Sequence, residues 1–286
     1  MKGDLLFQYY LTVFIDLVGQ KENLREIAEL PTNEIEKQQF IEVIKKSVGN
    51  VLHLRESFKN YFESANSYVT NTNLVLPELR EEFVAAQKSE IIVNGFSDSI
   101  IISVPLMNND ENCTSINGVH AAISATCGIG LIYLAAGIPF RAGLDVGIGT
   151  RINDKEIYGA SLERAYYLES CLAEYPRYLV GDELTTYLIS VENQQPITRL
   201  GLVAKSLAGF CRKMIIRDTD GRYMLDFLGN SIQETYKDTI NEDILAKAEE
   251  FAVSKYKEYL DQNNDKLSSR YYRLIYYINS RKKLWK

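Results

Sequence analysis

Apolar residues in the first third of the chain predict a strand, a helix and a hairpin. The run from Tyr9 to Val18 is rich in β-branched and aromatic residues, which is typical of a buried strand. Helical spacing follows between Asn33 and Ala65. A hairpin is then predicted from Glu90 to Gly95 and from Ser99 to Pro105, with a tight turn at Phe96-Ser97-Asp98. The apolar stripe of the predicted helix consists of Phe40, Val43, Ile44, Val51, Leu54 and Phe58.

The segment from Asn112 to Phe140 carries no charged residue, and it predicts a helix that ends near Ala136. Its later part, Ala121 to Phe140, is long enough to span a bilayer. Serine, threonine and several glycines interrupt it, a Gly-Ile-Pro sequence ends it, and no Lys/Arg cluster marks a cytoplasmic side. A helix buried on all sides therefore explains the segment better than a membrane span.

The next elements alternate between strand and helix. A strand is predicted from Phe140 to Ile148, and a polar turn at 153–155 leads to a short return strand. Gly159 opens an amphipathic helix that Pro176 stops, and Tyr178 to Val180 forms another short strand. The inward residues predicted for this helix are Leu162, Ala165, Tyr166, Leu168 and Leu172.

This order predicts an α+β sandwich in which helices cover one face of a mostly antiparallel sheet. A length of 286 residues fits one or two domains. We place the first domain at residues 7–183. A helix, a strand pair around Ile215 to Leu225 and two terminal helices from Asn241 and Leu267 then predict a C-terminal helical extension, residues 184–286, packed on that core.

Composition narrows the possible functions. Hydrophobic residues make up 46% and charged residues 24%, as in ordinary globular proteins. A net charge of −6 argues against broad binding to nucleic-acid phosphates. Four scattered cysteines without a CxxC pair exclude a zinc knuckle or a disulfide framework and fit a reducing cytoplasm. The N-terminal apolar run is flanked by Asp4 and Asp16 and lacks a small-residue cleavage site, so we expect no signal peptide.

Two aspartates are the strongest candidates for chemistry. His53 and His120, the two histidines, have no partners nearby in the sequence, which argues against a Ser-His-Asp triad or a His-rich metal site. Asp16 ends an apolar strand, where a lone carboxylate is costly unless it is paired or metal-bound. Asp98 lies at the tip of the apolar hairpin. If the two strands are neighbours, both carboxylates project from one edge and can hold hard divalent cations, although Asp98 alone also suits an ordinary turn.

At these positions the chain resembles the class III nucleotidyl cyclases. Their first strand ends in a phenylalanine-x-aspartate-apolar-x-glycine motif, matched here by FIDLVG from Phe14 to Gly19. Their second metal aspartate lies in a hairpin and matches Asp98. An arginine-x-glycine strand after Ile-Pro is matched by IPFRAG from Ile138, and the family's helix residues match Gly159, Ala165 and Glu169.

The chain is most similar to the pyrimidine cyclases of the Pycsar anti-phage systems. EIYGASLERAYYLES from Glu156 and EYPRYLVG from Glu174 are similar to their helix and following strand. DTDGRYMLDFL from Asp218 and SKYKEYLDQNN from Ser254 are similar to later blocks of these proteins. By themselves, Asp218, Asp220 and Asp226 fit a structural turn and a strand edge.

The resemblance implies a reaction and a set of residues. The ribose 3′-hydroxyl of a nucleoside triphosphate attacks the α-phosphate and displaces pyrophosphate, with two divalent cations, Mn²⁺ or Mg²⁺. Asp16 and Asp98 are the implied catalytic metal ligands, with the Leu17 carbonyl completing one shell. Backbone N–H groups of Val18, Gly19 and Gln20 are candidates to cradle the phosphates. These enzymes are head-to-tail homodimers with shared sites, so we expect a homodimer, with the apolar segment 121–140 contributing surface.

Departures from the family indicate the base. Asn94 replaces the lysine that reads a purine, and Glu156 replaces its partner aspartate, so a pyrimidine is expected, with the Tyr158 ring filling space. UTP is favoured over CTP because Glu156 can accept from the uracil N3–H, whereas the cytosine N3 would repel it. Glu163 and Tyr167 replace an asparagine and the transition-state arginine, and Arg164 points about 100° away around the helix.

The sequence alone leaves other functions open. One is a cytidylate cyclase, and another is a catalytically silent nucleotide-binding or dimerisation module, which the departures at 163 and 167 support. The tail, Leu267 to Lys286, interleaves basic and aromatic residues and could suit nucleic acid or an anionic membrane. We favour an amphipathic terminal helix with Leu274, Ile275 and Ile278 packed, and so expect neither a nucleic-acid nor a membrane partner. The cyclic-nucleotide effector is expected to be a separate protein.

Overall fold

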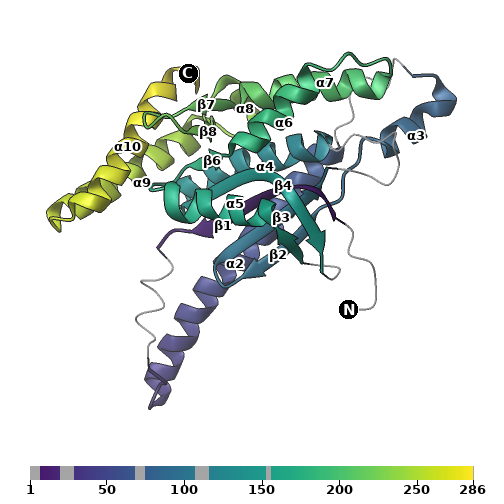
Figure 1. Ribbon diagram of the computed structural model, residues 1–286. Coiled ribbons are helices and arrows are strands. Elements are labelled where there is room, and N and C mark those ends of the chain that lie inside the picture. The colour runs from purple at the N-terminus through teal and green to yellow at the C-terminus, as the bar shows by residue number, and fades with distance from the viewer. Residues whose placement is uncertain (1–6, 20–28, 68–74, 107–115, 153–155, 286) are drawn as a thin grey trace.

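The computed structural model describes residues 7–19, 29–67, 75–106, 116–152 and 156–285 (Figure 1). Its strands form one mixed sheet in the order β2-β3-β1-β4-β6-β8-β7, and β5 pairs with β4. The β4–β6 pair is parallel and the other pairs are antiparallel. The strands are β1 (Phe7–Leu17), β2 (Ile92–Phe96), β3 (Ser99–Pro105), β4 (Phe140–Arg151), β5 (Ile157–Gly159), β6 (Tyr178–Val180), β7 (Ile215–Arg217) and β8 (Tyr223–Leu225).

The predicted helices are present in the predicted order, so the α+β class is confirmed, but α3 and α8 were not predicted and two helices, α6 and α7, replace the one predicted before the β7–β8 pair. A π-helical turn, Leu168–Leu172, continues α5, and short 3₁₀ turns lie at Pro77–Leu79 and Lys282–Trp285. The helices are α2 (Glu34–Ser67), α3 (Arg80–Ala85), α4 (Ile116–Ala135), α5 (Ala160–Tyr167), α6 (Asp182–Glu192), α7 (Arg199–Lys213), α8 (Asn230–Tyr236), α9 (Glu242–Asp261) and α10 (Asp265–Arg281).

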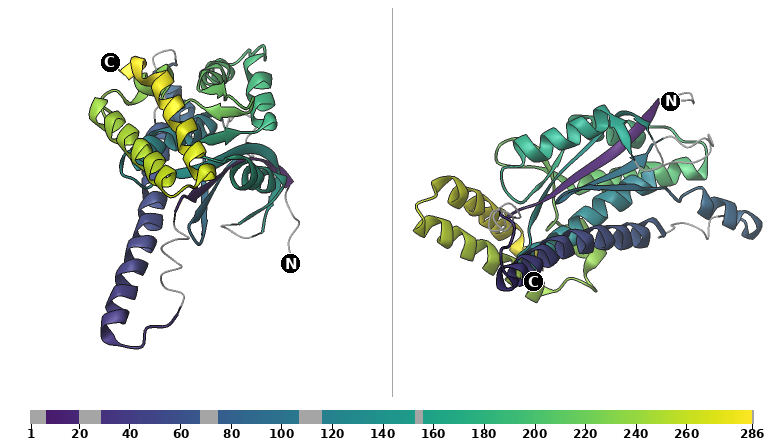
Figure 2. Two further views of the ribbon diagram at one scale, coloured as in Figure 1. Left: turned by 90° about the vertical axis from the view of Figure 1, so that its left-hand side faces the viewer. Right: turned by 90° about the horizontal axis from the view of Figure 1, so that it is seen from below.

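Helices cover both faces of the sheet, which corrects the prediction of a one-sided sheet (Figure 2). Alternate residues of β1 point to opposite faces. Val13 and Ile15 join the core that contains α4. On the other face, Thr12 Oγ1 donates to Ser161 Oγ of α5 at 3.0 Å. The predicted polar turn at 153–155 lies outside the described residues.

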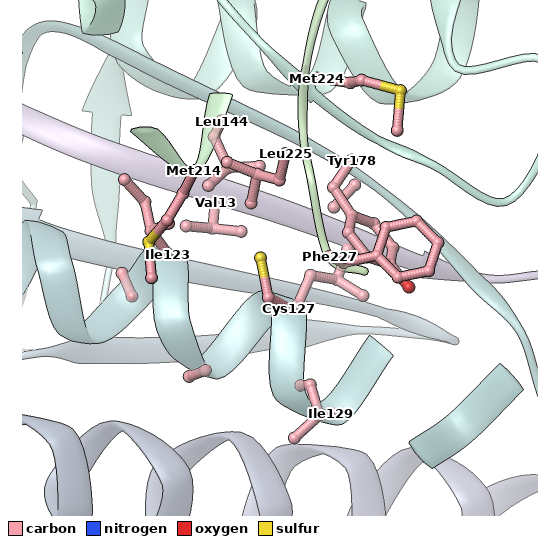
Figure 3. Close-up of a cluster of buried hydrophobic side chains, with 14 of the residues drawn as sticks. Val13, Ile123, Cys127, Ile129, Leu144, Tyr178, Met214, Met224, Leu225 and Phe227 are labelled. Atoms are coloured by element: carbon pink, nitrogen blue, oxygen red, sulfur yellow. The ribbon is translucent and has the colours of Figure 1, made fainter. Parts of the chain in front are cut away.

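The uncharged helix α4 is the centre of the core, as its composition predicts. By length and composition it could cross a membrane, but 83% of its most apolar window is buried inside the molecule. Figure 3 shows Ile123, Cys127 and Ile129 of α4 among side chains from β1, β4, β6 and the C-terminal part of the chain. The expectation that 121–140 contributes apolar surface to a dimer is therefore wrong, because its apolar side chains up to Leu134 fill the core almost throughout.

The C-terminal part of the chain shares this sheet and this core. β8 pairs with β6, and β7 extends the sheet beyond β8. Arg177, fully buried before β6, donates to Asp218 and to Asp220 at 2.8 Å. Tyr175 Oη also donates to Asp218 at 2.7 Å. The aspartates after β7 are thus structural, as the turn interpretation predicts.

The terminal helix α10 is amphipathic and packed, as predicted. Leu274 and Ile278 are buried in the core, and Ile275 packs against it. Tyr277 Oη donates to Asp226 at 2.9 Å, and Trp285 Nε1 donates to the Leu228 carbonyl at 2.9 Å. Tyr277 and Trp285 are thus part of the core, whereas Tyr272 and Tyr276 on the same helix are exposed.

Two predicted helix faces need correction. On α5, Tyr166 is 52% exposed, and the buried side chains are instead Ser161 and Ala165, followed by Glu169 in the π-helical turn. On α2 the buried stripe begins only at Ser47, because the first half of the helix extends away from the sheet (Figure 1). Helical spacing identifies which residues share a face, but not how far along that face a neighbour reaches.

Candidate active site

The Asp16 carboxylate lies at the end of β1, between two partner strands. Asp16 is opposite Ser99 of β3 and opposite Arg141 of β4. Ser99 Oγ donates to Asp16 Oδ1 at 2.8 Å, and Arg141 Nη2 lies 3.5 Å from Asp16 Oδ2. The Asp16 side chain keeps 21% of its surface exposed. The carboxylate is thus oriented from both sides and still reaches solvent.

Arg141 also holds a second, buried carboxylate. Its Nη2 lies 2.7 Å from Glu169 Oε1, and the Glu169 side chain is only 2% exposed. Burial raises the pKa of Glu169, while the Arg141 guanidinium and the Ser170 hydroxyl act in the opposite direction. Arg141 is therefore shared between an exposed carboxylate at the sheet edge and a buried one under α5.

Asp98 lies at the same edge of the sheet, in the turn that joins β2 to β3. Because β1 and β3 are neighbours, the turn is next to the end of β1, and Leu17 N–H donates to the Asp98 carbonyl at 3.5 Å. Ser97 has a φ of 54°, in the left-handed region that a tight turn uses. Asp98 is half-buried. The expected placement of the two aspartates at neighbouring strand ends is present.

A hollow of about 690 Å³ lies on the α5 face of the sheet, beside these strand ends. The strand register places Phe14, Ile101 and Asn94 in one row across β1, β3 and β2. Phe14 packs edge-to-face on Tyr166, with 5.3 Å between ring centroids. The hollow is lined by Phe14, Phe96, Ile101, Tyr158, Gly159, Ala160, Leu162, Glu163 and Tyr166.

The structure brings some of the predicted nucleotide-binding residues to this hollow. Tyr158 and Glu163 line it, and Asn94 is adjacent by register. Glu156 is exposed, two residues before Tyr158. Arg164 is directed elsewhere, since its Nη1 donates to the Val146 carbonyl at 2.9 Å and its Nη2 lies 3.8 Å from Glu183.

The predicted phosphate cradle needs a correction at its first residue. The Val18 N–H donates to the Pro139 carbonyl at 2.9 Å, because the chain after β1 continues to pair with the segment before β4. That N–H is therefore not available to a phosphate. Gly19 adopts a φ of 92°, in the left-handed region that favours glycine. Gln20 lies outside the described residues.

The donor set at this edge fits a hard divalent cation. The Asp16 and Asp98 carboxylates are oxygen donors of the kind that Mg²⁺ and Mn²⁺ prefer, and the Leu17 carbonyl would be a third. Across the described ranges, His, Cys, Asp and Glu side chains form no group of three or more that could hold a metal ion. His53 is hydrogen-bonded to Tyr133 on α4. Any cation at the Asp16 edge would thus take its remaining ligands from water or from a phosphate-bearing substrate.

The ion pair between Arg141 and Glu169 could not be predicted from the sequence motifs alone. Both residues were matched to family motifs, but their contact depends on the register of β1 against β4 and on where α5 crosses the sheet. One signal was present in the sequence. Arg141 is the single charged residue between Asn112 and Leu144, in an otherwise apolar segment, and such a charge requires a partner.

The likeness of this chain to known proteins is weak. No family model and no curated protein matches the chain. Among solved structures, a bacterial light-regulated adenylyl cyclase is similar with a TM-score of 0.41 and 13% identity, over 87% of this chain and 58% of that chain. The chain thus corresponds to little more than half of that protein. A likeness this distant says nothing about activity, which has to be inferred from the residues of the chain itself.

Proposed function

We propose that the protein is a metal-dependent nucleotidyl cyclase of class III type that converts UTP to 3′,5′-cyclic UMP and pyrophosphate. The observation that supports this most is the placement of Asp16 and Asp98 at adjacent strand ends, beside a hollow with aromatic walls. The motifs that resemble this family, FIDLVG and IPFRAG, supply the Asp16 and Arg141 side chains that meet in the structure.

In this proposal each residue near the strand ends has a definite task. Asp16, Asp98 and the Leu17 carbonyl hold two divalent cations, which when bound lower the pKa of the ribose 3′-hydroxyl and offset the charge of the triphosphate. Ser99 and Arg141 orient the Asp16 carboxylate from either side. Asp16 then directs the 3′-hydroxyl toward the α-phosphate, and pyrophosphate leaves.

The hollow is proposed as the site of the base. Phe14, Tyr158 and Tyr166 offer aromatic surface on which a pyrimidine can pack. Asn94 offers a donor and an acceptor to the ring edge, and Glu156 accepts from the uracil N3–H. Cytosine is the second choice, because its unprotonated N3 would face the carboxylate while only its amino group could donate.

A second copy of the chain is proposed to close the site as a homodimer. The hollow is open and surrounded by exposed aromatic side chains, with Phe96 77% and Tyr158 70% exposed. Exposed apolar clusters of this kind are typical of interaction surfaces. The partner would also supply the basic side chain that the triphosphate needs. This chain has Glu163 and Tyr167 at the positions where the family resemblance implies an asparagine and an arginine.

The biological role proposed is production of a second messenger for anti-phage defence in the cytoplasm. Its support is the resemblance of EYPRYLVG and DTDGRYMLDFL to Pycsar cyclases. In the structure these two blocks contact each other through Arg177, Asp218 and Asp220. The receptor of the cyclic nucleotide would be a separate protein.

A silent nucleotide-binding module is the competing function. Glu163 in the wall of the hollow favours it, because a carboxylate repels a triphosphate unless a cation lies between them. Incubation with each of the four ribonucleoside triphosphates and Mn²⁺, with products resolved by mass, separates the two. Cyclic UMP supports the proposal, cyclic CMP reverses the base, cyclic AMP or GMP removes the pyrimidine assignment, and no metal-dependent pyrophosphate release favours the silent module.

A further inference from the structure

A second hollow, of about 810 Å³, lies among α2, α4, α7 and α8. It is on the face of the sheet that α4 covers, whereas the Asp16 carboxylate is on the α5 face. Its volume is within the range of small-molecule sites, which is roughly 300–1,000 Å³. None of its lining residues belongs to the candidate active site.

His120 of α4 is a wall of this hollow and has an unused polar atom. Its Nε2 lies 3.3 Å from Ser124 Oγ, and its ring centroid is 5.5 Å from that of Phe210 on α7. Its Nδ1 is buried and has no hydrogen-bond partner in the part of the chain that the structure describes. Burial lowers the pKa of His120 to about 4, so the imidazole is neutral at physiological pH.

An orphaned buried nitrogen of this kind is costly unless another group pairs with it. The Ser124 hydroxyl can either donate to Nε2 or accept from it. Nδ1 itself has almost no accessible surface, so a ligand in the hollow meets other atoms of the His120 ring.

The remaining walls are aromatic or neutral. The Tyr61 and Tyr236 rings lie 5.8 Å apart, and Tyr236 Oη is held by the Ser124 carbonyl at 2.8 Å. The polar lining is hydroxyl and amide, and Glu234 at the exposed rim is its one charged residue. No lysine or arginine is among the described lining residues. A phosphate-bearing ligand would find no counter-charge here.

We propose that this hollow binds an uncharged, planar heteroaromatic molecule of about nucleoside size. Its ring stacks among Phe210, Tyr61 and Tyr236, beside the His120 imidazole, and its edge atoms pair with the hydroxyl and amide groups of the lining. The site is separate from the proposed catalysis and is present whether or not the protein is a cyclase.

Because the chain has only two histidines, the test can observe His120 directly. Full-length protein with isotope-labelled histidine gives two imidazole signals in NMR, and His53→Gln assigns them. Adenine, adenosine and AMP at millimolar concentration serve as probes that share a ring and differ in size and charge. We expect adenine and adenosine to shift the His120 signal in a saturable way, and AMP to bind at least about tenfold more weakly, a difference of about 1.4 kcal/mol.

A matched pair of variants on α7 locates the binding. Ser206 is exposed at the rim of the hollow, and Leu202, one turn earlier on the same helix, is exposed and does not line it. Ser206→Trp should abolish the shift of the His120 signal, and Leu202→Trp should retain it, with both variants checked by thermal unfolding. No shift of the His120 signal with adenine or adenosine would overturn the proposal, and so would an undiminished shift in Ser206→Trp. Equal binding of AMP would contradict the requirement for an uncharged ligand.

Discussion

Arg141 is the side chain through which the candidate site is tied to the core. It is 3.5 Å from the Asp16 carboxylate and 2.7 Å from that of Glu169. A buried carboxylate without its cation costs several kcal/mol, whereas a neutral isostere at the same place costs far less. The orientation of the exposed Asp16 thus depends on a pair that is hidden beneath α5.

Replacing Arg141 should show this dependence. We expect Arg141→Met to lower the free energy of unfolding by about 3 kcal/mol, because Glu169 is left buried without its partner. Adding Glu169→Gln should recover a large part of that loss in chemical denaturation. If the double variant is as unstable as the sum of the two single variants, the two side chains are not coupled.

The pH dependence of stability gives a second check on Glu169. Its pKa is raised above the ordinary value of 4.5, mainly by burial, so the folded protein holds this proton more tightly than the unfolded chain does. The stability that this bound proton contributes to the folded state is fully present below pH 4.5, and it is lost as the pH rises through the pKa of Glu169 in the folded protein. The difference between the melting temperature of Glu169→Gln and that of wild type should therefore increase as the pH rises above about 4.5. A difference that is constant or falls with pH would contradict the assignment.

At the scale of elements, glycines in β4 set how closely α5 approaches the sheet. A Cβ on Gly143 would lie 2.1 Å from the Ala165 carbonyl oxygen, and one on Gly147 would lie 2.6 Å from Ser161 N. Both obstacles are backbone, so neither can move aside without shifting α5. This close packing places Glu169 within reach of Arg141 and places Glu163 at the hollow.

Alanine substitutions test this packing. Gly143→Ala should destabilise the fold by roughly 3 kcal/mol, at the upper end of the usual cost of overpacking, because α5 must move. Gly49→Ala is the matched control, since Gly49 is in the exposed part of α2 and its added Cβ would meet nothing within 4 Å. That control should stabilise by up to about 1 kcal/mol through helix propensity. Equal effects at the two positions in thermal unfolding would refute the close approach.

The secondary-structure elements also show which features can be predicted from the sequence alone. Apolar runs, β-branched and aromatic residues and an uncharged segment predict β1, the β2–β3 hairpin, α4 and their order, and the cost of burying Asp16 identifies it as a candidate. The Arg141–Glu169 pair, the exposed face of Tyr166 and the use of the Val18 N–H by Pro139 could not be predicted in the same way. These features depend on strand register and on which helix covers which face, and neither is encoded in local periodicity.

At the scale of the whole molecule, the C-terminal part completes the sheet rather than forming an accessory. β8 pairs with β6, and α9 packs against the central helix α4. Arg177, with no exposed surface, is held by Asp218 and Asp220 from the β7–β8 turn. The candidate site on β1 and β4 therefore depends on a sheet whose far edge is contributed by residues 215–225.

Breaking this connection should unfold the chain as one unit. We expect Arg177→Met to cost about 3 kcal/mol, because Asp218 and Asp220 lose their buried cation and keep only the partly exposed Arg273 and Arg222. Circular dichroism and tryptophan fluorescence should report the same transition, since the single tryptophan, Trp285, is buried in the C-terminal part. Two separate transitions would instead show that residues 184–286 unfold independently of 7–183.

Asp16 and Asp98 together are proposed to hold the cations of a nucleotidyl cyclase. The most direct measurement is the rate of cyclic UMP formation from UTP and Mn²⁺ by wild type, Asp16→Asn and Asp98→Asn, with the exposed Asp238→Asn as control. We predict that each of the first two variants falls to less than about a tenth of the wild-type rate while its melting temperature and oligomeric state are retained, because losing a cation removes several kcal/mol of transition-state stabilisation. Asp238→Asn should be as active as wild type. If either strand-end variant keeps a tenth or more of the wild-type rate, the assignment of both aspartates to the cations is wrong.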